Sequence, residues 1–484
     1  MKRITAIIII LCIVVSIAAC ATENADEADT SASNNEVTSA VESTQLQPDI
    51  PDVTFDGADF SFLSREVTDT VVRFYSEVSC DEQNGEIMND TVYDRTVRIE
   101  EKYNVNIVDE TAKSVSATFR KSYLANEANW NVVIDAFMEA LAMVTAGYTA
   151  DLTSIEYIDL SKPWWDSRVA EDMMIRNQVY SAICAMNTWT DSHTYAIIFN
   201  KELAKNYNLD PYSMVRSNEW TLDNFNQIIA KVTGDIDGNG EMDENDRYGA
   251  VGENFNFTLH MLGSDIILIG HDEDGLFKIN IDDRFFTVAS KVSDMMLSGN
   301  YLIAEDYMSK YSDPWTDVLR KCFRSGNALF YVGGVEQMLI FRDLETDIGL
   351  LPMMKYDENQ EDFAHSFSTY WSSTIYVPRN LSNTEMTGIL LEAINADSYY
   401  SVAKAYYEVV LKGKAMRDLD SCEMIDIIRS SRTIDPEQAY GFLGINEIYY
   451  NILKNRSTEG FASKIEAVRS SAQTKIDKTL AKMQ

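Results

Sequence analysis

A run of eight residues narrows the possible folds of this chain more than any other segment. Trp130-Asn131-Val132-Val133-Ile134-Asp135-Ala136-Phe137 is almost continuous in apolar, mainly β-branched and aromatic residues. Such a run predicts a strand that is buried on both faces, as in sheets with helices on each side. Asp90 to Tyr103 has apolar residues at helical spacing after an Asn-Asp cap, and Asn104 to Val108 is typical of a strand. This alternation predicts a doubly wound α/β sheet.

The same alternation continues along the chain. Short apolar runs predict further strands at Thr70–Tyr75, Ala196–Asn200, Asn327–Val332 and Ser373–Val377, whereas the last hundred residues are mostly helical in pattern. We find no internal repeat. Ligands of such sheets bind at the carboxyl ends of the strands, so we expect the site residues to lie there.

The charge of the chain excludes several classes of partner. The 484 residues include 41 Lys+Arg and 76 Asp+Glu, which gives a formal net charge of −35. A nucleic-acid partner is excluded because phosphate binding needs a basic face. Polyanionic and membrane-surface substrates are disfavoured for the same reason. The hydrophobic fraction of 45% is that of a folded protein, and the length allows two or three domains.

The first residues predict export. Lys2 and Arg3 precede an apolar run from Ile4 to Val15, and small residues follow up to Cys20. This pattern is typical of a signal peptide, here residues 1–19. The tetrapeptide Ile17-Ala18-Ala19-Cys20 resembles a bacterial lipobox, which implies lipidation of Cys20; the alternative is an ordinary signal peptide with an incidental cysteine. We therefore expect a protein anchored by lipid on the extracytoplasmic face of the cell membrane, with no other membrane contact.

Residues 20–56 are expected to form a flexible acidic tether after the lipidated cysteine. From Ala21 to about Pro51 the segment is polar, without aromatic residues or hydrophobic periodicity, so it cannot offset the entropy of ordering. Four cysteines follow at wide spacing without a CxxC motif, which favours free buried thiols over a disulfide framework. They are Cys80, Cys184, Cys322 and Cys422.

The order of several motifs resembles that of the extracellular solute-binding proteins of bacterial ABC importers, of the maltose-binding type. The motifs are Ile158–Asp166, Gln178–Tyr180, Ile198–Leu203, Asn218–Phe225, Phe323–Phe330, Ile348–Pro352 and Tyr376–Pro378. The resemblance implies the two-lobe type II periplasmic-binding-protein fold, with hinge crossings and a helical C-terminal region. We expect lobe 1 at residues 57–187 plus 369–415, and lobe 2 at residues 188–368 plus 416–484.

The same resemblance implies a function. A monomeric receptor would close its lobes over a small solute, usually a sugar or oligosaccharide, and deliver it to the membrane permease of the importer.

A short acidic loop predicts a calcium site. Residues 235–246 place side-chain oxygens at loop positions 1, 3, 5, 9 and 12 with glycine at position 6, which suits a hard cation with six to eight oxygen ligands. Position 12 is Asp246, where the usual loop has the longer glutamate, so the ligand geometry differs there. The alternative is an acidic turn without metal. The expected ligands of a structural Ca²⁺ are Asp235, Asp237, Asn239, Glu241 (by its carbonyl), Asp243 and Asp246.

Aromatic residues near the expected lobe crossings predict the solute site. Sugars present apolar C–H faces ringed by hydroxyls, so their sites combine aromatic rings with polar side chains. The alternative for each single residue is a place in the core or on a lobe surface. The candidates near the crossings are Trp189, Asp191, Tyr370 and Trp371, and alignment with the family's order adds Phe137, Glu139, Glu336 and the glycines Gly333 and Gly334. Trp164 and Trp165 are expected to be packing residues.

Enzymatic activity is not indicated. The chain has no G-x-S-x-G, H-E-x-x-H or P-loop motif, and its four histidines show no ligand spacing. The leading hypothesis is therefore a receptor without a catalytic step. Two alternatives stay open at this point: a cell-surface carbohydrate hydrolase with a carboxylate pair, and a solute receptor that signals to a sensor kinase.

Overall fold

The computed structural model describes residues 45–67 and 74–483. The predicted signal peptide, Cys20 and most of the tether lie outside these residues, as do residues 70–73 of the predicted strand Thr70–Tyr75. The last two residues of that predicted strand, Phe74 and Tyr75, have irregular structure, and Tyr75 is buried. The folded part begins before residue 57, where the tether was expected to end, because Val53 and Phe55 pack against the core beside the first sheet.

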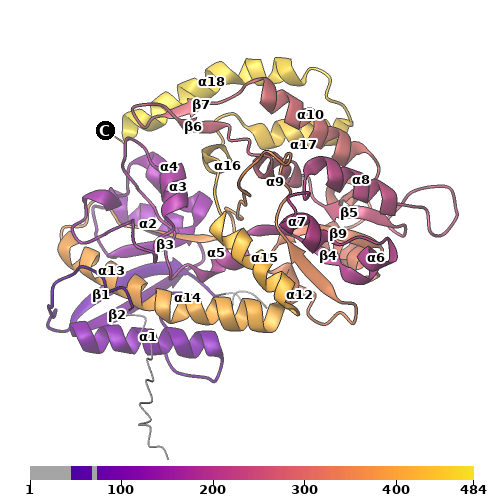
Figure 1. Ribbon diagram of the computed structural model, residues 1–484. Coiled ribbons are helices and arrows are strands. Elements are labelled where there is room, and N and C mark those ends of the chain that lie inside the picture. The colour runs from indigo at the N-terminus through magenta and orange to yellow at the C-terminus, as the bar shows by residue number, and fades with distance from the viewer. Residues whose placement is uncertain (1–44, 68–73, 484) are drawn as a thin grey trace, which may run out of the picture. The chain divides into compact units, whose positions relative to one another are not determined.

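The first sheet has helices on both faces (Figure 1). Its strands are β1 (Ala58–Arg65), β2 (Val105–Ala112), β3 (Val132–Ala136) and β11 (Ser373–Tyr376), in the spatial order β11-β3-β1-β2. β1 is parallel to β2 and β3, and β11 is antiparallel to β3. All five residues of β3 are buried, which confirms the prediction for this segment.

Alternating side chains of these strands form two separate cores. Phe62 and Ile134 pack against the face covered by α1 (Ile87–Tyr103) and α13 (Thr384–Tyr400). Leu63 and Val133 point to the opposite face, which α2 (Val115–Leu124) and α3 (Phe137–Ala146) cover. This is the period-2 alternation of a strand with both faces buried.

The second sheet has five strands of mixed direction. They are β4 (Tyr195–Asn200), β5 (Tyr248–Gly252), β8 (Tyr301–Ile303), β9 (Ala328–Gly334) and β10 (Ile348–Leu351), in the order β10-β4-β9-β5-β8. β5 is parallel to β8 and β9, whereas β4 is antiparallel to β9 and β10. The predicted strands of this region correspond to β4 and β9. β5, β8 and β10 were not predicted as strands, because runs of three to five residues carry little periodicity.

The remaining elements connect and cover the two sheets. They are η1 (Leu152–Ser154), α4 (Ser167–Met173), α5 (Thr188–Ser192), α6 (Lys201–Asn206), α7 (Pro211–Arg216), α8 (Leu222–Val232), α9 (Asn256–Gly263), β6 (Ile269–His271), β7 (Phe277–Ile279), α10 (Asp283–Leu297), η2 (Ala304–Tyr307), η3 (Trp315–Arg320), α11 (Lys321–Arg324), α12 (Gln337–Ile340), α14 (Val402–Ala405), η4 (Tyr406–Ala415), α15 (Leu419–Ser430), α16 (Pro436–Tyr440), α17 (Ile445–Asn455) and α18 (Phe461–Lys482).

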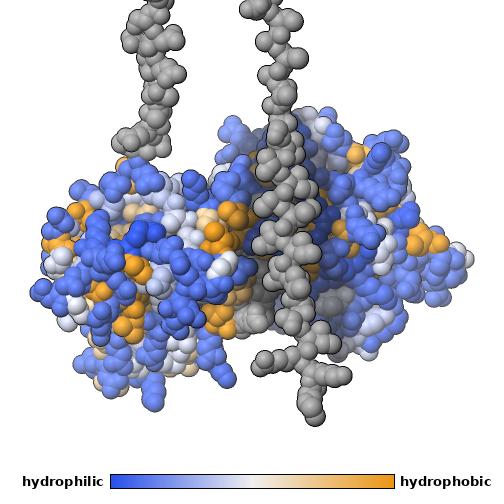
Figure 2. Space-filling view, turned by 90° about the horizontal axis from the view of Figure 1, so that it is seen from below, coloured by the Kyte–Doolittle hydropathy of each residue, from blue (hydrophilic) through white to orange (hydrophobic). Residues whose placement is uncertain are grey.

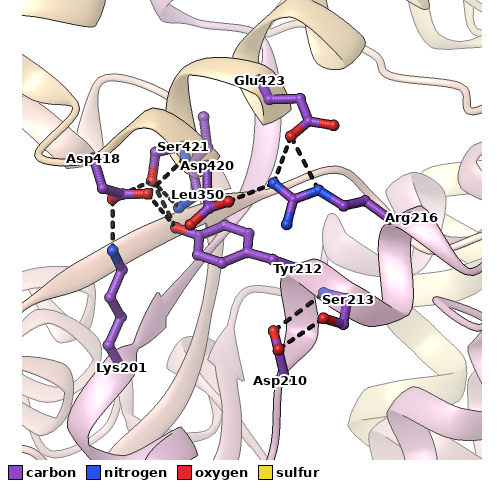
Figure 3. A network of polar contacts seen from close by, with 10 residues as sticks. All are labelled: Lys201, Asp210, Tyr212, Ser213, Arg216, Leu350, Asp418, Asp420, Ser421 and Glu423. Atoms are coloured by element: carbon purple, nitrogen blue, oxygen red, sulfur yellow. Dashed lines mark hydrogen bonds and ion pairs between the residues drawn. The ribbon is translucent and has the colours of Figure 1, made fainter.

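Helix α15 is held against the second sheet by a polar network around Asp418 (Figure 3). The Asp418 carboxylate accepts a hydrogen bond from the backbone N–H of Ser421 at 2.8 Å, which caps the helix, and pairs with Lys201 Nζ at 2.6 Å. The Ser421 hydroxyl accepts from the backbone N–H of Leu350 in β10 at 3.2 Å. The start of α15 is therefore fixed to β10 and α6.

The C-terminal helices contact both halves of the fold. Residues 402–415, expected in lobe 1, bury Val402, Tyr406 and Val410 in the core cluster beside the second sheet. Helix α18, expected in lobe 2, contacts α3 of the first half.

The surface is polar in keeping with the composition. The face shown in Figure 2 is largely hydrophilic, with hydrophobic residues in small separate groups. Within the described residues, no helix joins the length and the apolar character that crossing a bilayer requires. All four cysteines of the described part are free thiols, as predicted; Cys184 and Cys322 are buried, whereas Cys80 and Cys422 are partly exposed.

Candidate functional site

A cavity of about 190 Å³ lies where the carboxyl ends of β5 and β9 meet two segments that run between the sheets. Backbone hydrogen bonds fix these segments. The Ser368 N–H donates to the carbonyl of His193 at 2.9 Å and so joins the two segments, and the Val335 N–H, just after β9, donates to the carbonyl of Thr194 at 2.9 Å. The carboxyl ends of parallel strands are the usual place for a ligand in an open α/β sheet. The lining residues are His193, Tyr195, Glu253, Trp315, Leu319, Arg320, Tyr331, Val332, Gly333, Gly334, Glu336, Gln337, Ser368 and Trp371.

The ends of three parallel strands place glutamates at or beside this cavity. Glu253 follows β5, Glu336 follows β9, and Glu305 follows β8 just behind the wall. The Glu253 carboxylate accepts a hydrogen bond from the indole N–H of Trp315 at 2.9 Å. Glu336 Oε1 accepts from the side-chain amide of Gln337 at 2.9 Å. The sheet topology thus brings together carboxyl groups that are far apart in the sequence.

A glycine at the end of β9 makes room for one of these carboxyl groups. A Cβ atom added to Gly334 would lie 1.8 Å from Glu336 Oε2. This distance is far inside van der Waals contact, so any larger residue at position 334 would displace the Glu336 carboxyl from the cavity wall.

Burial changes the titration of the three glutamates. It raises the pKa of Glu336 to about 7 and that of Glu305 to about 7, and it raises the pKa of Glu253 as well. The Arg320 guanidinium partly opposes this shift for Glu336, whereas the charge of Glu253 adds to it. The cavity wall therefore carries carboxyl groups whose negative charge water does not fully solvate.

Aromatic rings form the other part of the wall. Trp371 is 53% exposed, and its ring lies nearly parallel to that of His193, with centroids 6.3 Å apart. Tyr195 packs against Phe255 at a centroid distance of 5.5 Å. An exposed indole beside carboxyl and amide groups suits a ligand with an apolar ring face and polar substituents.

Four of the predicted site residues line this cavity together: Trp371, Glu336, Gly333 and Gly334. Tyr370 is 66% exposed and adjoins Trp371 in the sequence. Trp189 lies instead in the hydrophobic core, where its ring meets that of Tyr75 edge-on at 6.5 Å. The aromatic residues near the crossings are thus divided between the cavity and the core.

Asp191 has a different environment from the cavity residues. It is buried on α5 and pairs with Arg432 at 2.6 Å, and Arg432 also pairs with Asp166 at 2.6 Å. Burial tends to raise the pKa of Asp191, but the guanidinium groups of Arg429 and Arg432 outweigh burial and hold this pKa below its usual value. These ion pairs join α5 to the segment after α15.

Phe137 and Glu139 begin helix α3. Phe137 is buried and meets the Phe367 ring edge-on at 5.0 Å, so it packs beneath the segment that carries Trp371. Glu139 accepts a hydrogen bond from the Ser116 hydroxyl at 2.9 Å. The two tryptophans expected to pack, Trp164 and Trp165, are buried and donate their indole N–H groups to Glu392 at 2.8 and 2.9 Å.

Sequence reasoning missed Tyr195, Glu253 and Trp315. Tyr195 begins β4 and directly precedes the predicted strand Ala196–Asn200, and Glu253 directly follows the short run Tyr248–Gly252. The signal that points to Glu253 is a glutamate immediately after a β-prone run that ends in glycine. Trp315 offers no such local signal, because its place in the cavity wall, where it donates to Glu253, depends on the tertiary fold.

The acidic loop after α8 brings three of its predicted ligands together. Side-chain oxygens of Asp235, Asp237 and Asp246 lie within 4.8 Å of one another. Asp246 is fully buried and accepts backbone hydrogen bonds from Ile236 and Asp243, both at 2.9 Å. Asn239 and Asp243 accept from the backbone N–H groups of Glu241 and Asn245 within the loop. This set of oxygen donors fits a hard divalent cation such as Ca²⁺.

Comparisons with known proteins support the fold. No protein-family model matches the chain, and none of the curated proteins matches it. Among solved structures, a sugar transporter from Rhizobium etli in an open conformation is 12% identical, with a TM-score of 0.57 over 86% of this chain and 99% of that chain. An ABC substrate-binding protein from Listeria monocytogenes in complex with cycloalternan is 13% identical, with a TM-score of 0.53 over 88% and 100%.

A sugar-binding protein from Xanthomonas citri is 12% identical, with a TM-score of 0.55 over 88% of this chain and 98% of that chain. At these identities the similarity establishes the fold alone. The chain therefore has the two-lobe α/β fold that its order of motifs predicts.

Proposed function

We propose that the chain is an extracytoplasmic receptor that binds a carbohydrate in the cavity between β5, β9 and the crossing segments, and delivers it to an ABC importer. The observation that carries this proposal is the placement of Trp371, Glu253 and Glu336 around one cavity at the carboxyl ends of parallel strands. The solved structures of similar fold are described as sugar transporters and sugar-binding proteins, which supports the same class of ligand.

The proposed mechanism is binding with closure of the two halves, without a covalent step. The segments that carry His193 and Trp371 run between the two sheets, so a change in their backbone angles would alter the spacing of the halves around the ligand. Aromatic contacts would select the ring face of the sugar, and the carboxyl and amide groups would select its substituents.

A ligand screen tests the proposal. Thermal shift of the full chain against a panel of mono- and oligosaccharides is expected to show stabilisation by a subset of them, because a ligand that binds only the native state raises apparent stability. Chromatography of the same mixtures should return the sugar intact. Accumulation of a product would instead favour a hydrolase, and the absence of any shift would contradict the receptor.

We also propose that Cys20 carries the lipid that holds the receptor at the membrane. The support is the apolar run followed by Ile17-Ala18-Ala19-Cys20. In cell fractionation, the wild-type chain is expected in the membrane fraction and Cys20→Ala in the soluble or culture fraction. The matched variant Cys422→Ala should stay with the membrane. Equal distribution of the Cys20 variant and the wild type would exclude the anchor.

The acidic loop is proposed to hold one structural Ca²⁺ ion. The three converging carboxylates of Asp235, Asp237 and Asp246 would repel one another without a cation, so the ion would stabilise the loop after α8. Adding Ca²⁺ to the chelator-treated chain should raise its melting temperature, and Asp237→Ser should remove this response. The exposed Asp272→Ser on another turn serves as a control. An unchanged melting temperature in wild type would refute the site.

A further inference from the structure

We infer that the solute carries a protonated amine, as amino sugars do, and that Glu336 and Glu253 bind its ammonium group. This inference rests on the proposed function and specifies the chemical class of the ligand in the same cavity. It comes from the charge of the cavity wall and from one buried acceptor atom.

The cavity wall has more negative than positive groups. Glu253 and Glu336 line it, and Glu305 lies at the adjacent strand end, where its carboxylate accepts the backbone N–H of Asn254 at 3.0 Å. Among the described lining residues, Arg320 is the one Lys or Arg. Its guanidinium already donates to Gln337 at 3.2 Å and to Thr316 at 3.1 Å. The wall therefore attracts a cation.

One carboxylate oxygen in the wall lacks a donor. Glu336 Oε2 is buried and accepts no hydrogen bond within the described part of the chain, while Oε1 of the same group is occupied by Gln337. Buried polar atoms are nearly always satisfied, and each exception calls for an explanation. Rotation of the Glu336 side chain away from Gly334, against which Oε2 lies, would let a donor of the ligand satisfy this atom.

The neighbouring carboxyl groups favour a charged donor over a hydroxyl. A neutral ligand would displace water from the cavity and disfavour the charged form of both carboxyl groups, whose pKa values burial already raises. An ammonium group would hold these carboxyl groups in the charged form and make the stronger, charge-assisted hydrogen bond. The faces of Trp371 and Tyr195 would add cation–π attraction and contact with the sugar ring.

The spacing of these groups favours an organic cation over a metal ion. Within the described residues, the acidic groups whose oxygens converge within 4.8 Å are those of Asp235, Asp237 and Asp246, in a different part of the second half. Glu253 and Glu336 are not part of such a cluster. They therefore suit an ammonium group that is carried by a larger ligand, whose other parts contact the rest of the cavity wall.

Three trisaccharides test the inference on the full chain: the glucosamine trimer, the N-acetylglucosamine trimer and maltotriose. Calorimetry at pH 6.5, where the amines are mostly protonated, is expected to show that the glucosamine trimer binds at least about tenfold more tightly than the other two. Equal or tighter binding of a neutral trimer would overturn the amine but uphold the sugar receptor. Binding of none of the three would overturn the inference, and the wider sugar panel then decides the receptor separately.

Two variants locate the effect. Glu336→Gln and Glu253→Gln should each reduce the preference for the glucosamine trimer by about tenfold, because each removes a carboxyl group that the bound ammonium would hold in its charged form. The control Glu101→Gln, an exposed residue on α1, should retain the full preference. An unchanged preference in both cavity variants would place the amine elsewhere and refute the inference. If a variant fails to fold, the comparison of the three ligands on wild type still decides the matter.

Discussion

At the scale of single residues, exposure separates side chains that the sequence presents alike. Trp189 and Trp371 both lie near crossings between the halves, but Trp189 is 3% exposed and Trp371 is 53% exposed. A buried indole contributes to packing, whereas a half-exposed indole in a cavity wall can contact a ligand. Trp371 is thus the aromatic residue of choice for mutation.

Trp371→Ala is expected to weaken sugar binding about tenfold, since an aromatic contact contributes about 0.5 to 1.5 kcal/mol beyond its buried area. The free energy of unfolding should change by less than about 0.5 kcal/mol, because the side chain is exposed. Calorimetry and urea denaturation measure the two effects. Tyr370→Ala, the exposed neighbour outside the cavity lining, is the matched variant; equal effects of both on binding would argue against a specific role of Trp371.

Arg432 is the residue on which the buried ion pairs of α5 depend. Arg432→Met would leave the buried Asp191 and the partly exposed Asp166 with one guanidinium fewer, and removing one partner of a buried pair costs about 3 to 5 kcal/mol. We expect a loss of this size in urea denaturation. Arg98→Met breaks the exposed pair with Asp397 and should cost about 0 to 1 kcal/mol. A similar small loss for both variants would contradict the structural role of Arg432.

At the scale of elements, helix α15 connects the two halves. Its first residues attach to β10 and α6 through Asp418 and Ser421 (Figure 3). The chain just beyond its last residue carries Arg432, which pairs with α5 and with Asp166. Polar contacts thus hold both ends of α15. If the two halves close, either α15 moves with them or the halves rotate about the ion pairs of Arg432.

Removal of the cap of α15 should destabilise the fold. Asp418→Ala removes the hydrogen bond to Ser421 N–H and the pair with Lys201, which together amount to about 2 to 3 kcal/mol. Asp210→Ala removes an exposed cap of α7 and should cost about 1 kcal/mol. Chemical denaturation compares the two. If Asp418→Ala costs no more than Asp210→Ala, the Lys201 pair contributes nothing to stability.

At the scale of the whole molecule, buried acids make stability depend on pH. Burial raises the pKa of Glu392 to about 7, that of Glu437 to about 7 and that of Asp435 to about 6. These groups bind protons more tightly in the folded than in the unfolded chain. Their contribution to stability is therefore complete below about pH 4 and is lost as the pH rises through 6 to 7. The net charge of −35 acts in the same direction, because like charges repel in the compact state.

The free energy of unfolding is expected to fall by about 2 kcal/mol or more between pH 5 and pH 8. Urea denaturation at the two values measures the change. Glu392→Gln should reduce the difference, since a neutral amide replaces a group that titrates in this window, while the exposed Glu101→Gln should leave it intact. A chain that is more stable at pH 8 than at pH 5 would contradict the raised pKa values.

Local patterns in the sequence were sufficient for the class of fold and for the longer elements. The apolar run of β3, the helical spacing of α1 and the order of the motifs follow from residues close together in the chain, since burial on both faces and helical periodicity are local properties. The three-residue strand β8 was not predicted, because its pattern is too short to distinguish from a loop.

The site depended on contacts between distant residues. His193, Glu253, Glu336 and Trp371 meet because the order of strands in the second sheet and the crossing segments bring them together. Whether a tryptophan faces the core or the cavity, and whether a carboxyl group has a raised pKa, depends on neighbours that are distant along the chain, such as Tyr75 for Trp189 and Glu253 for Glu336. The local sequence does not indicate those neighbours, so the burial and the pKa values of the cavity side chains are determined only by the tertiary structure.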